Sequence, residues 1–487
     1  MRRRDFVRTS AAAATGAALS PMILPRHVLG GSGFRAPSDR LRLAAIGAGG
    51  MGAQNMSRLT TEHIVALADI DFGYVDGGIE RRLTNRDGSR NERWHTLQAA
   101  YAEANRYADF RELLDAESDL DGVVISTPDH VHALAALMAM ERGLHVYAQK
   151  PLCYSVEECR RLAHAAESTG LVTQMGNQGH SGDDGRRLVE LVRSGLLGEI
   201  REIQCWTDRP AGWWGQGIDR PAPQDPPDGV AWDLFLGPAP EQPFYEGTHP
   251  FGWRGWVDFG VGALGDMGAH ILDFPVWALG LGQPRQIQTR RSPWGGERGQ
   301  PPVTYPVASM TTYVFDRADI GQGDGGDLTF TWYDGGLRPP TPAGAPDGFA
   351  LNPDGGGIFV GERGKLVYDT YGRNPRLLAA DGNHGALQAE AEAVPVSLPR
   401  IEGSMGAHEQ NWVRAIHGEE PVSCPFSYAA PLTETMLLGV AAMYEEKPVL
   451  YDADAMRITN APAADAQLRR TYRSGWDLPA ESVFSQG

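Results

Sequence analysis

Three side chains in this sequence have the types and the spacing of a group that acts on a hydroxyl. Lys150 precedes Pro151, and a proline there restricts the backbone that carries the lysine. The lysine ammonium can donate to a substrate hydroxyl and stabilise developing alkoxide charge. Asp266 and His270 stand four positions apart and therefore share one face of a helix. Histidine suits removal of a hydroxyl proton as hydride leaves the same carbon, with Asp266 orienting it or binding a neighbouring hydroxyl.

Each of these residues has a simpler interpretation when it is taken alone. A lone lysine is usually a surface residue, and the Asp266–His270 pair is compatible with a helix cap beside a packed core histidine. Metal binding by the pair lacks a third ligand at a recognisable spacing, so we predict no metal site. The catalytic interpretation of Lys150, Asp266 and His270 therefore depends on the motifs around them.

A glycine-rich turn is the first of those motifs. Residues 47–52 read Gly-Ala-Gly-Gly-Met-Gly, directly after an apolar strand and before a predicted helix. In such a turn the first glycine permits the tight bend, the second lets the backbone approach a pyrophosphate, and the last allows close helix–strand packing. The residues of this turn that we predict to bind a dinucleotide are Gly47, Gly49, Gly50, Met51 and Gly52.

An acidic residue at the end of the next strand makes the nucleotide prediction more specific. Asp69 lies 22 positions after Gly47, where a carboxylate accepts hydrogen bonds from the adenosine ribose hydroxyls. Because a carboxylate in that place repels a 2′-phosphate, we expect NAD rather than NADP as the cofactor. Asp71 is a weaker competitor for the same role, and we expect Ile70 to contact the cofactor as well.

Two further strand ends are predicted to lie at the same edge of the sheet. Thr127 and Pro128 follow one strand, and we expect them to pack along the nicotinamide half of the cofactor. His130 is interpreted as a cap or surface residue. The other cofactor contacts predicted at these strand ends and just beyond them are His132, Gln149, Lys150 and Gln178.

The elements that must position these residues follow an α/β pattern. From residue 40 to residue 178, short apolar runs alternate with helical stretches, which predicts a doubly wound parallel sheet and hence a Rossmann domain. Residues 179–450 are predicted to form a catalytic α+β domain on an open antiparallel sheet, with Asp266 and His270 on a helix over 263–279. Residues 451–487 are predicted to be a polar tail. The strands expected in the second domain are 200–206, 307–314, 328–333, 357–360 and 365–368.

A long segment of the second domain, residues 210–262, has no periodicity but many aromatic side chains. Such stretches are usually functional or disordered, and the tryptophans argue against disorder. We expect side chains here to stack on a sugar face or to make polar contacts with it, with core packing as the alternative for each tryptophan. The candidates are Trp213, Trp214, His249, Trp253, Arg254 and Trp256.

The first 35 residues predict export. Twin arginines, a nearby hydrophobic residue and an uncharged alanine-rich run are typical of a twin-arginine signal, so residues 1–35 are assigned to a signal and linker. We therefore expect an exported, periplasmic protein that the twin-arginine machinery transports. The formal net charge of −17 argues against nucleic-acid and anionic-membrane partners. The four cysteines match neither a disulfide scaffold nor a zinc pattern.

Taken in order, these motifs resemble the glucose–fructose oxidoreductase / inositol dehydrogenase / rhizopine catabolism (Gfo/Idh/MocA) family over residues 41–476. The ordered set is the glycine turn, the strand-ending acid, Thr-Pro with a following histidine, Lys-Pro, and D-x-x-x-H. The resemblance implies that Lys150, Asp266 and His270 are the catalytic group. The family usually has glutamate before the lysine, whereas this chain has Gln149, which can hydrogen-bond the nicotinamide ribose but adds no negative charge.

The resemblance and the export signal together imply an NAD-dependent oxidoreductase acting on a hydroxyl of a sugar, polyol or glycoside. Free NAD is scarce outside the cytoplasm and the twin-arginine route carries folded proteins, so we expect tightly bound NAD that is recycled in each cycle. Paired oxidation and reduction of two sugars and redox-neutral glycoside cleavage both remain open. A noncatalytic sugar-binding protein is a further alternative, disfavoured by the three catalytic residues together. We also expect a homo-oligomer formed through the C-terminal sheet.

Overall fold

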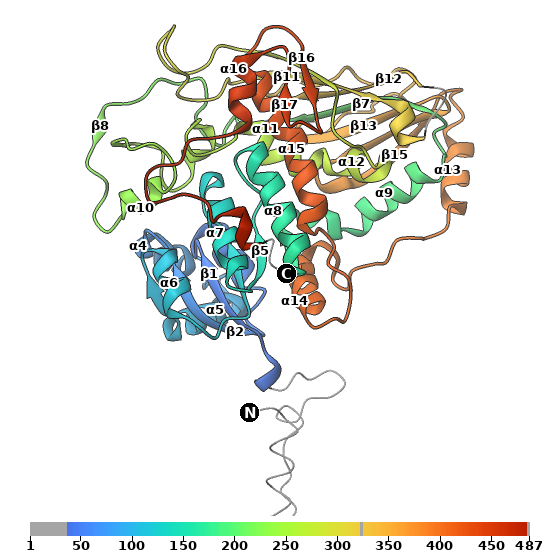
Figure 1. Ribbon diagram of the computed structural model, residues 1–487. Coiled ribbons are helices and arrows are strands. Elements are labelled where there is room, and N and C mark those ends of the chain that lie inside the picture. The colour runs from blue at the N-terminus through green and yellow to red at the C-terminus, as the bar shows by residue number, and fades with distance from the viewer. Residues whose placement is uncertain (1–36, 322–324, 485–487) are drawn as a thin grey trace, which may run out of the picture. The chain divides into compact units, whose positions relative to one another are not determined.

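The first part of the chain forms a six-stranded sheet in the order β3-β2-β1-β4-β5-β6, drawn in blue and cyan in Figure 1. All of its strand pairs are parallel. Every residue of β4 is buried, as expected for a central strand that helices cover on both faces. The Rossmann prediction is confirmed. The strands are β1 Arg42–Ile46, β2 His63–Ala68, β3 Asn105–Tyr107, β4 Gly122–Ile125, β5 His145–Ala148 and β6 Thr173–Met175.

The connecting helices have local signals that fix their ends. In the last of them, α8, Ser155 and Glu158 form a capping box, and Gly170 ends the helix with a left-handed backbone. Helix α7 is nearly all buried because it is alanine-rich and packs between the sheet and α8. The helices are α3 Gly50–Met56, α4 Phe72–Glu80, α5 Glu92–Glu103, α6 Phe110–Ala116, α7 Asp129–Glu141 and α8 Val156–Thr169.

The computed structural model describes residues 37–321 and 325–484. The predicted twin-arginine segment, residues 1–35, lies outside the described residues. Both sheets belong to one unit, which begins at Arg42. Among the described residues, no helix combines the length and the apolar composition that a membrane crossing requires.

The second sheet has nine strands in the order β15-β14-β13-β7-β12-β11-β10-β16-β17. It is antiparallel as predicted except at one place, where β12 and β7 pair in parallel. That exception arises because β7 enters from the Rossmann domain and lies between two later strands. The strands are β7 Ile200–Thr207, β10 Gln286–Arg291, β11 Ser309–Asp316, β12 Asp327–Tyr333, β13 Gly355–Gly361, β14 Gly364–Asp369, β15 Arg373–Ala379, β16 Val449–Asp452 and β17 Arg457–Ile458.

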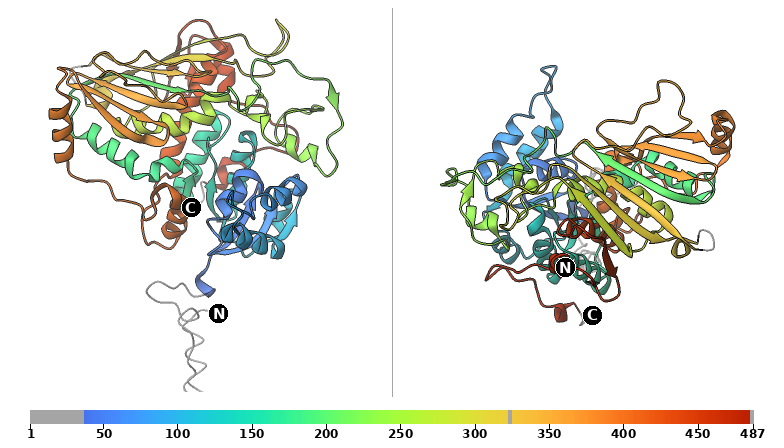
Figure 2. Two further views of the ribbon diagram at one scale, coloured as in Figure 1. Left: turned by 180° about the vertical axis from the view of Figure 1, so that it is seen from behind. Right: turned by 90° about the horizontal axis from the view of Figure 1, so that it is seen from above.

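Helices cover one face of this sheet, as Figure 2 shows from behind and from above. The expected helix over 263–279 is two helices, α11 and α12, which meet at Leu272. Helix α15 begins at Phe426, five residues before Pro431, and packs on both α8 and the sheet, so one hydrophobic core joins the two domains. The helices are α9 Asp183–Arg193, α11 Gly262–Ile271, α12 Asp273–Leu279 and α15 Phe426–Ala442.

The C-terminal segment is not a detached tail. Its first strands, β16 and β17, extend the nine-stranded sheet. Further on, Trp476 is 5% exposed, and its ring lies 6.3 Å from that of Phe110 at the start of α6. The guanidinium of Arg111 lies 3.8 Å from the centre of the Trp476 ring. This segment therefore returns to the Rossmann domain and packs there.

Candidate active site

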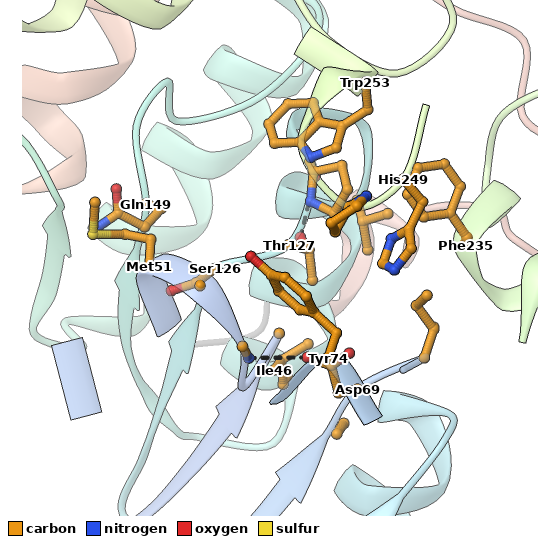
Figure 3. A pocket seen from close by; sticks show the side chains of 18 of the residues that line it. Ile46, Met51, Asp69, Tyr74, Ser126, Thr127, Gln149, Phe235, His249 and Trp253 are labelled. Atoms are coloured by element: carbon orange, nitrogen blue, oxygen red, sulfur yellow. Dashed lines mark hydrogen bonds between the residues drawn. The ribbon is translucent and has the colours of Figure 1, made fainter. Parts of the chain in front are cut away.

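A cavity of about 370 Å³ opens at the carboxyl ends of the parallel strands, where ligands of such sheets bind. Figure 3 shows Met51 and Gln149 at one side of it and Asp69 with His249 at the other. The predicted residues that line it are Gly47, Gly49, Gly50, Met51, Asp69, Ile70, Thr127, Pro128, Gln149, Lys150, His249, Trp253 and Arg254. The predicted residues that belong to the described part of the chain but not to this lining are Gly52, His132, Gln178, Trp213, Trp214, Trp256, Asp266 and His270.

Backbone geometry explains the glycines of the turn between β1 and α3. Gly47 has φ of 81°, a left-handed conformation that other residues adopt at a cost. A side chain at Gly52 would place its Cβ 1.9 Å from the Gly47 carbonyl oxygen. Asp69 Oδ2 accepts from the backbone N–H groups of Ala48 at 2.8 Å and Gly49 at 3.0 Å. The carboxylate thus holds the turn in place from the end of β2.

The Asp69 end of the cavity is covered by the aromatic-rich segment of the second domain. Asp71 is the N-cap of α4, and its side chain accepts from the Tyr74 N–H at 2.8 Å. Its other oxygen, Oδ2, lies 2.9 Å from Nε2 of His249. His249 was predicted as a substrate contact, but it lies at the Asp69 end, away from Lys150. Burial raises the pKa of Asp69 above its ordinary value, although the backbone N–H donors and His249 oppose this.

At the other end, Asp266 holds two cations. Lys150 Nζ donates to Asp266 Oδ1 at 2.7 Å and to the Asp266 carbonyl oxygen at 2.8 Å. Arg254 Nε donates to the same Oδ1 at 3.1 Å. Burial alone would raise the pKa of Asp266, but Lys150 and Arg254 hold it well below the usual range. Asp266 is therefore a permanent carboxylate that fixes the lysine in place.

His270 lies one turn further along α11. It is 5% exposed, and its Nδ1 has no hydrogen-bond partner within residues 37–321 and 325–484. Burial and the nearby Lys150 ammonium hold the pKa of His270 well below its ordinary value, so the imidazole is neutral. Its ring centre lies 4.7 Å from that of Tyr371, a residue that sequence reasoning missed. The expected orientation of His270 by Asp266 is not seen, because the carboxylate is turned to Lys150 and Arg254.

The predicted aromatic contacts separate into packing and surface residues. Trp256 is 2% exposed and stacks on Tyr245 with ring centres 5.7 Å apart, so it has no face left for a sugar. Trp213 is 51% exposed, and the Arg209 guanidinium lies 3.6 Å from its ring centre. Trp214 donates from Nε1 to a glutamine side chain at 2.7 Å. Of the four tryptophans predicted, Trp253 is the one that lines the cavity.

Three further predicted cofactor residues have distinct surroundings. His132 places its two ring nitrogens 2.9 Å from the carbonyl oxygens of Thr127 and Pro151, so it positions both strand ends and does not reach the cavity. Gln149 lines the cavity, and its buried Nε2 has no partner among the described residues. Gln178 likewise has a buried, unpartnered Oε1 in that part of the chain, outside the cavity lining.

A dinucleotide fits this cavity on three observations. Gly47 and Gly52 of the turn have no space for a side chain, Asp69 stands at the ribose position, and the orphaned Gln149 amide is a ready donor at the opposite side. No cluster of three or more potential metal ligands occurs in the residues that the structure describes.

Sequence reasoning also gave no role to Asp129. Asp129 is the first residue of α7, is 3% exposed, and lines the cavity. The available signal was its position directly after Thr127 and Pro128 at a strand end.

Comparison with known proteins agrees with this architecture. The profile of the Gfo/Idh/MocA oxidoreductase family, described by its NAD-binding Rossmann fold, matches residues 41–177. The profile of that family's C-terminal alpha/beta domain matches residues 182–289. Both domains are therefore those of one family.

Curated relatives match over part of their length. A glycosyl hydrolase family 109 protein of Shewanella pealeana is 29% identical over 213 residues, which cover 41% of this chain and 44% of the relative. An alpha-N-acetylgalactosaminidase of Shewanella oneidensis is 28% identical over 212 residues, with the same coverage of 41% and 44%. The chain thus matches less than half the length of these relatives.

Solved structures resemble the whole two-domain arrangement. The WlbA dehydrogenase of Chromobacterium violaceum, in complex with NADH and UDP-GlcNAcA, has a TM-score of 0.56 at 15% identity and covers 85% of this chain and 97% of its own. The WlbA dehydrogenase of Bordetella pertussis has a TM-score of 0.54 at 14% identity, covering 85% and 100%. At these identities the likeness concerns the fold.

Proposed function

Because the chain belongs to the Gfo/Idh/MocA family of NAD-binding oxidoreductases, we propose that it transfers hydride between NAD and a carbinol carbon of a sugar, polyol or glycoside. The observation that carries this proposal is the Lys150–Asp266–Arg254 cluster, with neutral His270 one turn away, at the Gln149 side of a dinucleotide cavity.

The residues of the cluster have separate roles in the oxidation of a substrate hydroxyl. Neutral His270 accepts the hydroxyl proton through a ring nitrogen. Lys150 has three N–H donors, of which Asp266 takes two, so the third is free to bind the substrate oxygen and stabilise its negative charge. When bound, NAD supplies the acceptor for the hydride. Asp266 keeps Lys150 oriented and its charge balanced.

A second candidate function is redox-neutral cleavage of a glycoside. The names of the relatives favour it, since they include a glycosyl hydrolase family 109 protein and an alpha-N-acetylgalactosaminidase. In this chemistry, transient oxidation of a hydroxyl acidifies a neighbouring C–H, the glycosidic oxygen is eliminated, and the carbonyl is reduced again. The same cluster serves both candidates, because both begin by oxidising a hydroxyl.

Export completes the proposal. The twin-arginine pattern in residues 1–35 supports transport of the folded protein to the periplasm, and bound NAD would then be regenerated within each cycle. A homo-oligomer through the nine-stranded sheet stays a prediction.

The test begins with mass spectrometry of the purified full-length protein under native conditions, to detect copurified NAD. A panel of sugars, polyols and para-nitrophenyl glycosides is then screened for reduction of the bound cofactor and for nitrophenol release. We expect bound NAD and at least one sugar that reduces it. Protein that neither carries nor binds NAD but still binds a sugar would instead be a noncatalytic sugar-binding protein.

A further inference from the structure

Asp129 is a buried carboxyl in the cavity that the mechanism above does not use. It begins α7, directly after the Thr-Pro pair that follows β4, and shares the cavity lining with Lys150 and Arg254. At 3% exposure, its carboxyl is shielded from bulk water. Burying a charged carboxylate is costly unless it is paired or hydrogen-bonded, and buried carboxyls with few partners are frequent at functional sites.

The hydrogen bonds of Asp129 leave half of its carboxyl group available. Oδ2 accepts from the backbone N–H of Val261 at 3.2 Å. Oδ1 has no hydrogen-bond donor in the part of the chain that the structure describes. Lys150 and Arg254 donate to Asp266 instead. One oxygen of Asp129 can therefore act on a molecule in the cavity.

The charges around Asp129 set its proton affinity. Burial raises the pKa of Asp129 to about 7, although the two cations oppose this. On its own helix, burial lowers the pKa of His130 to about 3 and that of His132 to about 4, so both are neutral near pH 7. Asp129 thus gains and loses its proton near neutrality. The charged groups that act on Asp129 from neighbouring elements are Lys150, Arg254 and Asp266, and Tyr305 is a further titratable neighbour. On α7 itself the titratable groups are His130 and His132 beside Asp129 and Glu141 at the far end of the helix.

Redox-neutral glycoside cleavage needs two proton acceptors. One takes the hydroxyl proton during oxidation, and the other takes the C–H proton beside the new carbonyl. Asp266 is locked as a carboxylate between two cations, and His270 is assigned to the hydroxyl. We propose that Asp129 is the second acceptor, the base that removes the C–H proton next to the transient carbonyl. This inference rests on the redox-neutral form of the proposed function.

The elimination then balances. Asp129 takes the proton, the C–H electron pair forms the carbon–carbon double bond, and the bond to the leaving oxygen breaks with its electrons on that oxygen. The leaving oxygen takes the proton that His270 received during oxidation. Water then adds at the carbon that lost the leaving oxygen and gives a proton to His270. The proton on Asp129 exchanges with solvent before this step, and Asp129 then gives a solvent-derived proton to the neighbouring carbon. Bound NAD would supply the hydride for the final reduction, and His270 returns its proton to the oxygen to restore the hydroxyl.

Solvent deuterium separates this role from the oxidation step. The full-length protein with its bound NAD is incubated in deuterium oxide with para-nitrophenyl N-acetyl-α-galactosaminide and the other para-nitrophenyl glycosides of the panel. Deuterium in the released sugar is located by NMR, and cofactor reduction is followed by absorbance. Asp129→Asn keeps an oxygen for the Val261 N–H but cannot take the proton. We expect it to lower deuterium incorporation and glycoside cleavage about 100-fold or more while cofactor reduction persists.

Asp334→Asn is the matched control. Asp334 is also a buried carboxyl with its pKa raised to about 7 by burial, but it directly follows β12 of the nine-stranded sheet, where it accepts from Ser309 and Trp332. We expect normal exchange from this variant. In the wild type, exchange should fall as the pH drops below about 7, because the base form of Asp129 is required.

The outcomes distinguish the two proposals. Wild-type protein that reduces its cofactor but incorporates no deuterium overturns the role of Asp129 and leaves hydride transfer intact. Undiminished exchange in Asp129→Asn overturns it as well. Wild-type protein that neither reduces its cofactor nor cleaves any probe overturns the proposed function, and the inference with it.

Discussion

The two ends of the cavity are built by different means. The Asp69 end is built mainly from backbone groups. Gly47 has a left-handed conformation, Gly52 has no space for a side chain, and the Asp69 carboxylate accepts from N–H groups of the turn. At the Lys150 end, charged side chains from three segments hold one another. The first end is suited to holding a cofactor unchanged and the second to moving charge. Substitutions should therefore separate binding from turnover.

The largest effect is expected from Gly52→Ala. The added Cβ would lie 1.9 Å from the Gly47 carbonyl oxygen, so the whole turn must shift. We expect loss of most bound NAD and a lower melting temperature, measured by cofactor content and calorimetry. Gly385→Ala in the helix His384–Ala393 is the control, since nothing lies within 4 Å of its added Cβ. A Gly52→Ala protein with full NAD content would contradict the backbone account of this end.

Lys150→Ala tests the other end. Loss of the donor to the substrate oxygen should lower turnover by about 10²–10³-fold, while bound NAD is largely retained. Single-turnover reduction of the cofactor measures the first quantity and cofactor content the second. Lys447→Ala, at an exposed lysine, should leave both unchanged. Near wild-type turnover in Lys150→Ala would remove the lysine from the mechanism.

Asp69→Asn should change selectivity rather than rate. The amide oxygen can still accept from the turn, but it no longer repels a 2′-phosphate. We expect the preference for NAD over NADP to fall by about tenfold, which is about 1.4 kcal/mol. The ratio of the two dissociation constants, measured on cofactor-free protein, gives the result. Asp76→Asn, on a half-exposed surface ion pair, is the control.

Gln149→Glu is the mildest change. The carboxylate keeps the oxygen but removes the orphaned Nε2 donor, which should weaken NAD binding by about 1 kcal/mol, or about fivefold in Kd. Titration calorimetry on cofactor-free protein would measure it. An unchanged Kd would show that the amide is not used by the cofactor.

The same comparison explains what could be predicted from sequence. Gly47, Gly52 and Asp69 could be identified because their roles are set by residues close to them in the sequence and by a fixed strand–turn–helix geometry. The spacing of Asp266 and His270 identified both residues but not their partners, since Asp266 turns to Lys150, 116 positions away. Such choices depend on packing between distant segments.

The aromatic segment, residues 210–262, shows most clearly which roles could not be predicted from sequence. Composition predicted that Trp256 and Trp213 both stack on a sugar. In the structure Trp256 is buried against Tyr245, whereas Trp213 is half exposed beside Arg209. The strands β15, at one edge of the nine-stranded sheet, and β16, next to the other edge, were missed because each has a mixed pattern of polar and apolar residues.

Trp476 lines the cavity that Gly47 begins. During synthesis the glycine turn leaves the ribosome more than 400 residues before this ring does, and domains generally fold in that order. One wall of the cavity is therefore absent until Trp476 has been synthesised. Loading of the cofactor becomes a late event in the maturation of the protein, and a nascent chain arrested before Trp476 would hold it only weakly.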